Sequence, residues 1–219
     1  MKSINMKKIL VMTIALTYII LADGYDYKIS KIEPDILERM INGNSYKENC
    51  PVKDIDLRYI ELNYIDFNGK TQTGELIVHY KVAHNVVKVF RELYNIKYPI
   101  REMALVSDFK GSDFASIEAD NTSAFNCRNI AGTSRWSKHA YGKAIDINPI
   151  ENPYISKSGN ISHTKSLKYR DRRHTKNTSA SRAMILADDK ARKIFTKYGW
   201  SWGGYWKSIK DYQHFEYKK

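Results

Sequence analysis

The spacing of hydrophobic residues in the first half of the chain predicts two strands separated by a turn. Ile60, Leu62 and Tyr64 recur at every second position, which is the period-2 pattern of a half-buried strand. Residues 66–69 read Asp-Phe-Asn-Gly, a sequence typical of a turn. Residues 75–80 are then expected to form the second strand.

Helical spacing is clearest between residues 82 and 93. Pro99 follows closely enough to stop that helix. Residues 188–198 indicate a second helix, because acids stand at its start and bases at its end, as the helix dipole prefers. Gly199 suits its C-terminal stop, and a shorter helix is expected over residues 34–41. The hydrophobic residues on one face of the first helix are Val82, Val86, Val87, Phe90 and Leu93.

The remaining segments mix short strands with long polar loops. Residues 103–109, 143–148 and 214–217 are predicted to be strands, whereas residues 110–138 and 150–182 are expected to be loops. Loops of this length are uncommon in compact domains unless they serve a function. Strands and helices do not follow the rhythm of βαβ units, so the sequence predicts an α+β fold with a small antiparallel sheet flanked by helices.

The first 22 residues are predicted to be an export signal. Lys2, Lys7 and Lys8 precede an uncharged hydrophobic run over residues 9–21, and Ala22 is a small residue at a suitable cleavage point. A membrane-spanning helix needs about 20 apolar residues, so the run favours a cleaved signal peptide. The alternative is an uncleaved N-terminal membrane anchor.

The rest of the chain is expected to form one domain. The protein has 219 residues in all, a length that suits a single domain with an appendage. Residues 23–49 are interpreted as an N-terminal lead-in with little regular structure, and residues 50–219 as the domain itself. Nothing in the sequence fixes the oligomeric state, and we expect a monomer.

Charge gives a weaker indication of partners. The formal net charge is +12, and it falls to +9 without residues 1–22, which carry three lysines and no acid. This excess favours polyanionic surroundings, and for an exported protein an anionic cell-wall polymer is the natural candidate. The basic cluster at residues 168–174 has a single tyrosine, whereas nucleic-acid binding favours interleaved aromatic residues. Specific nucleic-acid binding is therefore not expected, and a solvated loop is the simpler interpretation of the cluster.

Two cysteines, Cys50 and Cys127, are far apart in the sequence. In an oxidising compartment such a pair tends to be bridged, and we expect a disulfide that ties an N-terminal segment to the loop before residue 139. Two buried free thiols are the alternative, and a role as metal ligands is weaker still.

The chemistry of the chain is concentrated in two short segments. His139 and Asp146 are seven residues apart with Gly142 between them, and Asp211 and His214 follow near the C-terminus. Two imidazoles and one carboxylate form a three-ligand zinc site, and three protein ligands leave one coordination position open, as in catalytic sites. His139, Asp146 and His214 are therefore the predicted ligands of Zn²⁺.

Asp211 is the candidate general base. On a regular strand, residues three apart point to opposite faces, so a helical turn over residues 210–213 is predicted to bring Asp211 beside His214. A carboxylate next to the metal could accept a proton from water. The alternative is a solvent-exposed acid at the start of a strand.

Together these segments resemble the D-alanyl-D-alanine carboxypeptidase family of bacterial zinc peptidases, whose wider clan includes hedgehog-like domains. The resemblance extends over residues 50–219. It is carried by Cys50-Pro-Val, the Gly-Glu-Leu at 74–76, the Tyr-Pro-Ile at 98–100, the segment 121–128, the Ser-x-His-x-x-Gly-x-x-x-Asp block at 137–146, Asn148-Pro, Asn152-Pro-Tyr, the Gly-Trp-x-Trp-Gly-Gly-x-Trp of 199–206 and the Asp-Tyr-Gln-His-Phe of 211–215.

The resemblance implies roles for further residues. It implies that Arg128 faces the active site, where a guanidinium can hold a carboxylate or an oxyanion. Ser137, Trp202 and Trp206 are expected to help bind substrate, and Ser137 is also a candidate for orienting His139. Asp120 stands where the family usually has asparagine, and Ile117 where it usually has methionine. These departures affect the expected specificity rather than the reaction.

The resemblance further implies a zinc metallopeptidase that hydrolyses peptidoglycan stem peptides, with residues 50–219 as its catalytic domain. A D-alanyl-D-alanine carboxypeptidase is the leading expectation. An L-alanyl-D-glutamate endopeptidase and a zinc-stabilised wall-binding module without turnover are the alternatives. The sequence leaves open which peptide bond is cut, whether the enzyme acts on its own wall or another cell's, and what residues 165–176 do.

Overall fold

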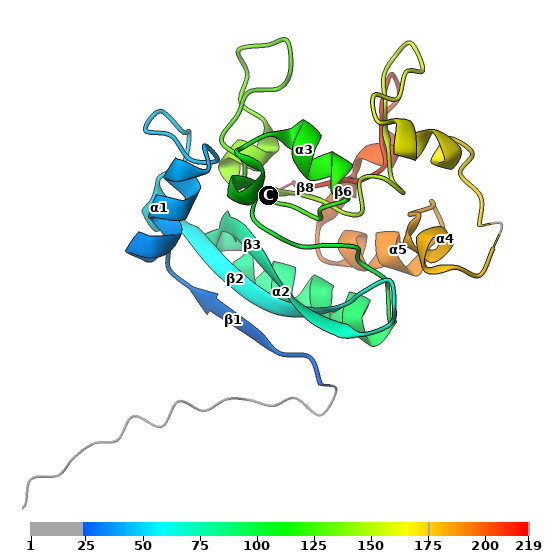
Figure 1. The fold of residues 1–219 in the computed structure, drawn as a ribbon, viewed down its shortest axis with the longest axis horizontal. Helices are drawn as coiled ribbons and strands as arrows, with labels where there is room; N and C mark the ends of the chain where they lie inside the picture. Colours follow the sequence, from blue (N-terminus) through cyan, green and yellow to red (C-terminus); the bar gives the residue numbers. More distant parts are fainter. Residues whose placement is uncertain (1–23, 175, 219) are drawn as a thin grey trace, which may run out of the picture.

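The computed structural model describes residues 24–174 and 176–218, so the predicted export signal lies outside the described residues. Helices and three small antiparallel sheets are mixed along the chain (Figure 1), which confirms the α+β class. In the described part no helix is both long and apolar enough to cross a membrane. The strands are β1 Tyr27–Ser30, β2 Leu57–Ile65, β3 Thr71–His79, β4 Ala144–Asp146, β5 Tyr154–Ile155, β6 Trp200–Trp202, β7 Lys210–Asp211 and β8 His214–Tyr217. The helices are α1 Pro34–Asn42, α2 Tyr80–Asn95, α3 Asp113–Glu118, α4 Ser179–Ala183 and α5 Lys190–Lys197.

The largest sheet has the strand order β1-β2-β3, with both pairs antiparallel. The predicted strands around residues 60–64 and 75–80 are confirmed as β2 and β3, which form a hairpin. The predicted turn at 66–69 is also confirmed: Gly69 N donates to the Asp66 carbonyl at 3.0 Å, and Asp66 Oδ1 accepts from the N–H groups of Asn68 and Lys70. The Asp66 side chain thus holds the turn and sets the hairpin register.

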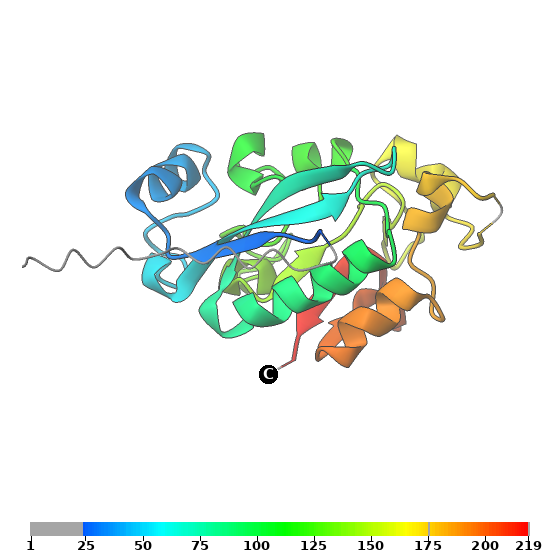
Figure 2. The same cartoon turned by 90° about the horizontal axis from the view of Figure 1, so that it is seen from below.

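Helix α2 covers one face of this sheet, with α5 beside it (Figure 2). Its predicted apolar face is confirmed, because Val82, Val86, Phe90 and Leu93 are at most 1% exposed. His79 is its N-cap, and the ring accepts a hydrogen bond from Lys81 N. These contacts bury the main core, on which the second sheet also packs.

The N-terminal segment is more ordered than predicted, because residues 23–49 contain β1 and α1. β1 pairs with the edge of β2, and Tyr25 just before it is 1% exposed. The predicted short helix is confirmed as α1, whose Arg39 binds Glu75 of β3 at 2.7 Å. A four-residue strand gets its order from pairing with a distant partner, which local sequence pattern does not reveal.

The predicted strand over residues 103–109 is wrong. Residues Val106–Phe109 form a 3-10 turn instead. The side chain of Asn121 forms hydrogen bonds with both backbone groups of Ala104: Oδ1 accepts from the N–H at 2.7 Å, and Nδ2 donates to the carbonyl at 3.0 Å. These are the groups that a sheet partner would need. The following polar stretch is not one continuous loop either, because it contains α3.

The second sheet, with the order β4-β8-β6, carries two of the three predicted metal ligands. The predicted strands near residues 143–148 and 214–217 are confirmed as β4 and β8. The predicted helix near residues 188–198 is confirmed as α5, and the chain leaves it through Gly199 at a φ of +88°. Phe195 of α5 stacks on Phe215 of β8 at a centroid distance of 3.9 Å, so α5 packs directly against the strand that carries His214.

The basic stretch that ends near residue 176 is not wholly solvated, which corrects the simple loop interpretation. Arg172 is partly buried and donates to the carbonyls of Glu151 and Ile185 and to Asn152 Oδ1. Its guanidinium lies 4.4 Å from the ring centroid of Tyr212. Arg172 therefore braces the segment between β7 and β8, where the candidate base and the last metal ligand lie.

Candidate metal centre

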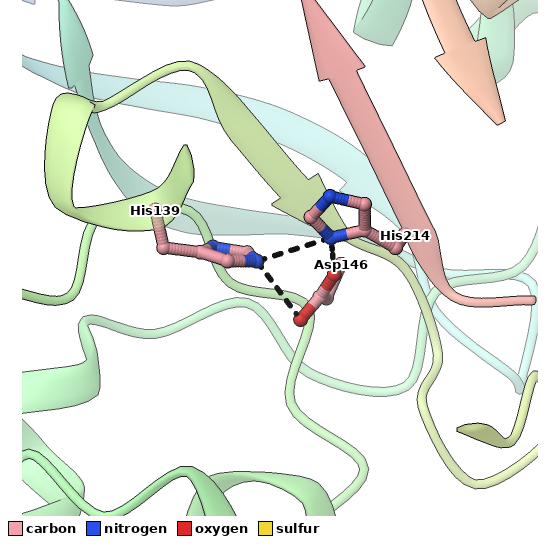
Figure 3. Close-up of side chains that lie close together, drawn as sticks. All are labelled: His139, Asp146 and His214. Atoms are coloured by element: carbon pink, nitrogen blue, oxygen red, sulfur yellow. Dashed lines mark hydrogen bonds and ion pairs between the residues drawn. The ribbon is translucent and has the colours of Figure 1, made fainter. Parts of the chain in front are cut away.

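The three predicted metal ligands lie together because two of them face each other across a pair of strands. Asp146 of β4 and His214 of β8 are directly paired in the antiparallel register, and such residues project on the same face of a sheet. His139 reaches them from a 3-10 turn over Lys138–Tyr141. Figure 3 shows the three side chains pointing toward one another.

The turn that carries His139 depends on its two caps. Ser137 is the N-cap, and its hydroxyl accepts a hydrogen bond from His139 N at 3.3 Å. Gly142 ends the turn at a φ of +62°, and a Cβ there would lie 2.5 Å from the backbone nitrogen of His79. Only glycine combines this conformation with so close an approach. Ser137 thus orients a ligand, as expected for one of its two roles.

The spacing of the donor atoms fits a small divalent cation. His139 Nε2 lies 3.2 Å from His214 Nδ1 and 3.3 Å from Asp146 Oδ2, and His214 Nδ1 lies 3.0 Å from Asp146 Oδ1. Bonds of about 2.0–2.1 Å to a tetrahedral zinc ion place its ligand atoms roughly 3.3 Å apart. Among the described residues these side chains form the group of ligand atoms close enough to hold one ion.

In each of the two imidazoles, one nitrogen points away from the cluster and has a partner there: Nδ1 of His139 and Nε2 of His214. The other nitrogen, Nε2 of His139 and Nδ1 of His214, is then free to coordinate a metal ion. His139 Nδ1 lies 2.5 Å from the Ala124 carbonyl, to which it donates. His214 Nε2 lies 3.7 Å from a carboxylate oxygen of Glu216. Such partners fix the tautomer and orientation of metal-binding histidines. Glu216 was not singled out in the sequence, although it follows His214 by two residues on a predicted strand, where alternate side chains share a face.

The cluster attracts positive charge. Burial lowers the pKa of His214, but hydrogen bonding to Asp146 and the nearby acids outweigh this and raise the pKa to about 10. Burial opposes the ionisation of Asp146, yet the adjacent His139 and His214 hold its pKa well below the usual range. A divalent cation at these ligands would have to displace this proton, so its binding would release protons and depend on pH.

Asp211 lies in the same cleft as the three ligands, but the predicted helical turn over residues 210–213 is wrong. Asp211 ends β7, which pairs with β5, and a bend at Tyr212 and Gln213 leads into β8. The bend interrupts the alternation of side chains along the strand, and so it allows Asp211 and His214 to face the same cleft, as the helical turn was expected to do. Within the described chain Asp211 Oδ1 is buried and has no hydrogen-bond partner. Burial is the main cause that raises the pKa of Asp211 to about 6.

The cleft has a volume of about 520 Å³. Arg128 lines it, and its guanidinium forms an ion pair with Asp113 of α3. Asp113 also accepts from Asn126 Nδ2 at 2.8 Å. Arg128 thus lies in the cleft and is held there by an acidic partner. Asp113 was not anticipated, because nothing in its sequence neighbourhood links it to residue 128.

The two predicted tryptophans have different positions. Trp206 lines the cleft, with its ring centroid 5.3 Å from that of His214. Trp202 is 4% exposed and lies in the core, where its indole donates to the Tyr212 carbonyl at 2.8 Å. Its predicted contact with substrate does not fit this position. Trp202 instead anchors the bend that follows Asp211.

Cys50 and Cys127 are bridged, with Cα atoms 5.7 Å apart, which confirms the predicted disulfide.

His163 also lines the cleft, and its Nδ1 lies 2.6 Å from Glu118 Oε1. The segment around His163 therefore forms a wall of the cleft.

Residues 131–217 match the model of a family described as D-alanyl-D-alanine carboxypeptidase, and this confirms the family resemblance. The match includes Ser137, the three metal ligands and Asp211, but it leaves Arg128 and the disulfide outside. No curated protein and no solved structure matches the chain.

Proposed function

From the match of residues 131–217 to the D-alanyl-D-alanine carboxypeptidase family, we propose that this protein is a zinc-dependent carboxypeptidase that removes the terminal D-alanine from peptidoglycan stem peptides. The observation that carries the proposal is the placement of His139, Asp146 and His214 in one cleft with Asp211 and Arg128. Zn²⁺ is the proposed ion because two imidazoles and one carboxylate suit it.

When bound, zinc supplies Lewis acidity at the scissile carbonyl and makes nearby water more acidic. Asp211 takes the proton from the attacking water and passes it to the departing amine. Its raised pKa of about 6 suits both transfers near neutral pH. The buried, unpartnered Oδ1 is the atom that accepts the proton.

Arg128 is proposed to hold the free carboxylate of the terminal residue. A guanidinium binds a carboxylate through two parallel hydrogen bonds, which fixes orientation as well as position. Asp113 holds Arg128 at the cleft wall. This requirement for a terminal carboxylate favours a carboxypeptidase over an L-alanyl-D-glutamate endopeptidase, which cuts inside the peptide.

The test is mass spectrometry of purified muropeptides incubated with the protein, with and without a chelator. Loss of one alanine would support the carboxypeptidase, whereas release of a larger peptide would identify the endopeptidase. Asp211→Ala should abolish either cleavage, and Asp188→Ala, an exposed acid outside the cleft, is the matched control. A substrate with a C-terminal amide should be cut poorly if Arg128 binds the carboxylate.

A wall-binding module without turnover is the alternative function. It would retain one equivalent of metal and bind peptidoglycan but cleave none of the stem peptides. Asp211 argues against it, because a site without catalysis gains nothing from a buried acid beside its metal, and burying such a group is costly.

Export and partners belong to the same proposal. We infer that residues 1–22 are a signal peptide and that the mature protein acts outside the cytoplasm, with an uncleaved anchor as the alternative. N-terminal sequencing of the exported protein would distinguish these, because cleavage gives a new terminus after residue 22. We also propose that the protein acts as a monomer, which sedimentation would test.

A further inference from the structure

A second cavity is lined by residues of α4, of the start of α5 and of the segment after α2. Figure 1 shows α4 and α5 next to each other. The cavity has a volume of about 540 Å³, and it shares no lining residue with the catalytic cleft among the described residues. Nothing in the proposed peptidase reaction uses it. Its lining therefore needs a separate explanation.

Four cations line this cavity. Lys97 follows α2, Lys176 precedes α4, Arg182 belongs to α4, and Lys190 begins α5. None of the described carboxylates forms an ion pair with any of them; the hydrogen-bond partner of Arg182 is the hydroxyl of Ser179 at 3.3 Å. Four cations without an acidic partner around one cavity create a local positive potential that attracts an anion.

The one carboxylate among the described lining residues is already engaged. Asp189 Oδ2 accepts from Leu186 N at 2.7 Å and lies 3.0 Å from His174 Nε2. Asp189 is also the N-cap residue of α5, yet its side chain makes no capping hydrogen bond. The first-turn N–H groups of α5, those of Lys190 and Ala191 among them, therefore have no side-chain acceptor at the edge of the cavity. Such groups favour negative charge.

A buried hydroxyl provides an independent indication. Ser181 lines the cavity and is 6% exposed, and within the described chain its Oγ has no hydrogen-bond partner. Leaving a buried hydroxyl unpaired is unfavourable. A ligand with acceptor oxygens would satisfy it together with the cations and the helix N–H groups.

We propose that this cavity binds the phosphate groups of a polyol-phosphate polymer. Donors converge from α4, from α5 and from the segment after α2, and a phosphate offers more acceptor oxygens to such an arrangement than a carboxylate does. The volume exceeds that of a single phosphate, so a chain segment fits. Nucleic acid is disfavoured because the described lining offers no free ring for base stacking. Tyr98 is 6% exposed and donates to the Ala183 carbonyl at 2.6 Å, and the His174 ring is held between Asp189 and the Ser181 carbonyl.

The test is isothermal titration calorimetry of the full protein with poly(glycerol phosphate) and with inorganic phosphate. The double variant Arg182→Gln/Lys190→Gln should bind the polymer about tenfold more weakly than the wild type, because charge-assisted contacts to phosphate are lost. The matched control is Lys47→Gln/Lys53→Gln, which removes the same charge from exposed positions outside the cavity. This control should bind as the wild type does.

The variant Ser181→Ala distinguishes binding in this cavity from nonspecific attraction to the net positive charge. It removes one hydroxyl and no charge, and it should weaken polymer binding about threefold to tenfold. All variants should still cleave soluble muropeptides at the wild-type rate if they cleave them at all, and their circular dichroism should be unchanged. The binding measurement uses no peptide substrate, so its outcome is independent of the peptidase proposal.

Three results would overturn the inference. The control variant could lose as much affinity as the cavity variant, which would mean that only net charge matters. Polyglutamate or an oligonucleotide of equal charge could bind as tightly as poly(glycerol phosphate), which would refute the choice of ligand. Finally, an affinity unchanged by both Ser181→Ala and the double variant would place binding elsewhere.

Discussion

Reducing the Cys50–Cys127 bridge is expected to cost much of the stability of the fold while leaving the metal centre intact. The two cysteines are separated by 77 residues. Closing a loop of that length lowers the entropy of the unfolded chain, and the corresponding stabilisation is about 4.5 kcal/mol at 25 °C. Domains of this size are stable by roughly 5–15 kcal/mol, so the reduced protein should keep only a small margin.

The bond also has a local consequence. Cys127 is buried with Met40 and Phe125 in a small core between α1 and the sheet, and its N–H donates to the Ser45 carbonyl at 2.9 Å. The next residue is Arg128. The metal ligands lie on other elements, so reduction should loosen the substrate-binding wall before it affects the metal.

The assay is urea unfolding of the oxidised and reduced protein, followed by tryptophan fluorescence. A phosphine reductant is preferable, since thiols bind zinc. Reduction should lower the free energy of unfolding by about 4.5 kcal/mol and raise the dependence on urea, because the reduced unfolded chain is more expanded. Metal content should stay at one equivalent. The variant Cys50→Ala/Cys127→Ala should reproduce the loss and should not respond to reductant.

The reasoning would be refuted if reduction lowered the free energy of unfolding by less than about 1 kcal/mol, since the loop-closure argument would then fail for this chain. Loss of metal at a urea concentration where the fold persists would refute the second part. In that case the N-terminal segment would be supporting the metal ligands directly.

Three further predictions follow from individual contacts. Glu216→Gln should weaken metal affinity about 10- to 100-fold, because this carboxylate faces the outer nitrogen of the metal-binding imidazole on β8; competition with a chromophoric chelator measures it, and unchanged affinity would contradict the contact. Arg172→Met should lower the free energy of unfolding by about 3 kcal/mol in urea, since several buried acceptors lose their donor, whereas Arg173→Met on the same exposed stretch should have little effect. The pKa of Glu75 is lowered chiefly by its hydrogen bonds with Arg39, so the stability it contributes is complete above the unfolded pKa and is lost as the pH falls through the lower folded value. The melting temperature should therefore decrease as the pH is lowered past about 4.3. The variant Arg39→Gln should show a smaller decrease over the same pH range.

The sequence predicts which three side chains come together as candidate metal ligands because their chemistry is local. His139 and Asp146 stand in one short block with the glycine that its turn requires, and few residue types bind zinc. The β2–β3 hairpin and α2 are likewise readable, since one buried face imposes its own period on the sequence. In these elements the pattern and the fold have the same cause.

Other features depend on contacts between distant segments and leave no local pattern. β1 is a strand because β2 offers it an edge. Residues 103–109 do not form a strand, because the Asn121 side chain takes up the backbone hydrogen-bonding groups of Ala104. Trp202 reads as a binding residue from its motif, but the strand turns it into the core. The bend after Asp211 shows the same limit: the need to bring Asp211 and His214 together could be predicted, but not the geometry that does so.

The division between matched and unmatched residues suggests how the site is organised. The family match begins at residue 131 and contains the metal ligands and Asp211, so the groups proposed to carry out bond cleavage lie within it. Arg128 and its partner Asp113 lie before it, yet they line the cleft that would hold the substrate, and the disulfide next to Arg128 also lies before it. Reaction and specificity would then be determined by different segments. Exchanging or loosening the earlier segment should change which peptide is bound, as a rise in KM, while the chemistry at the metal and its kcat change less.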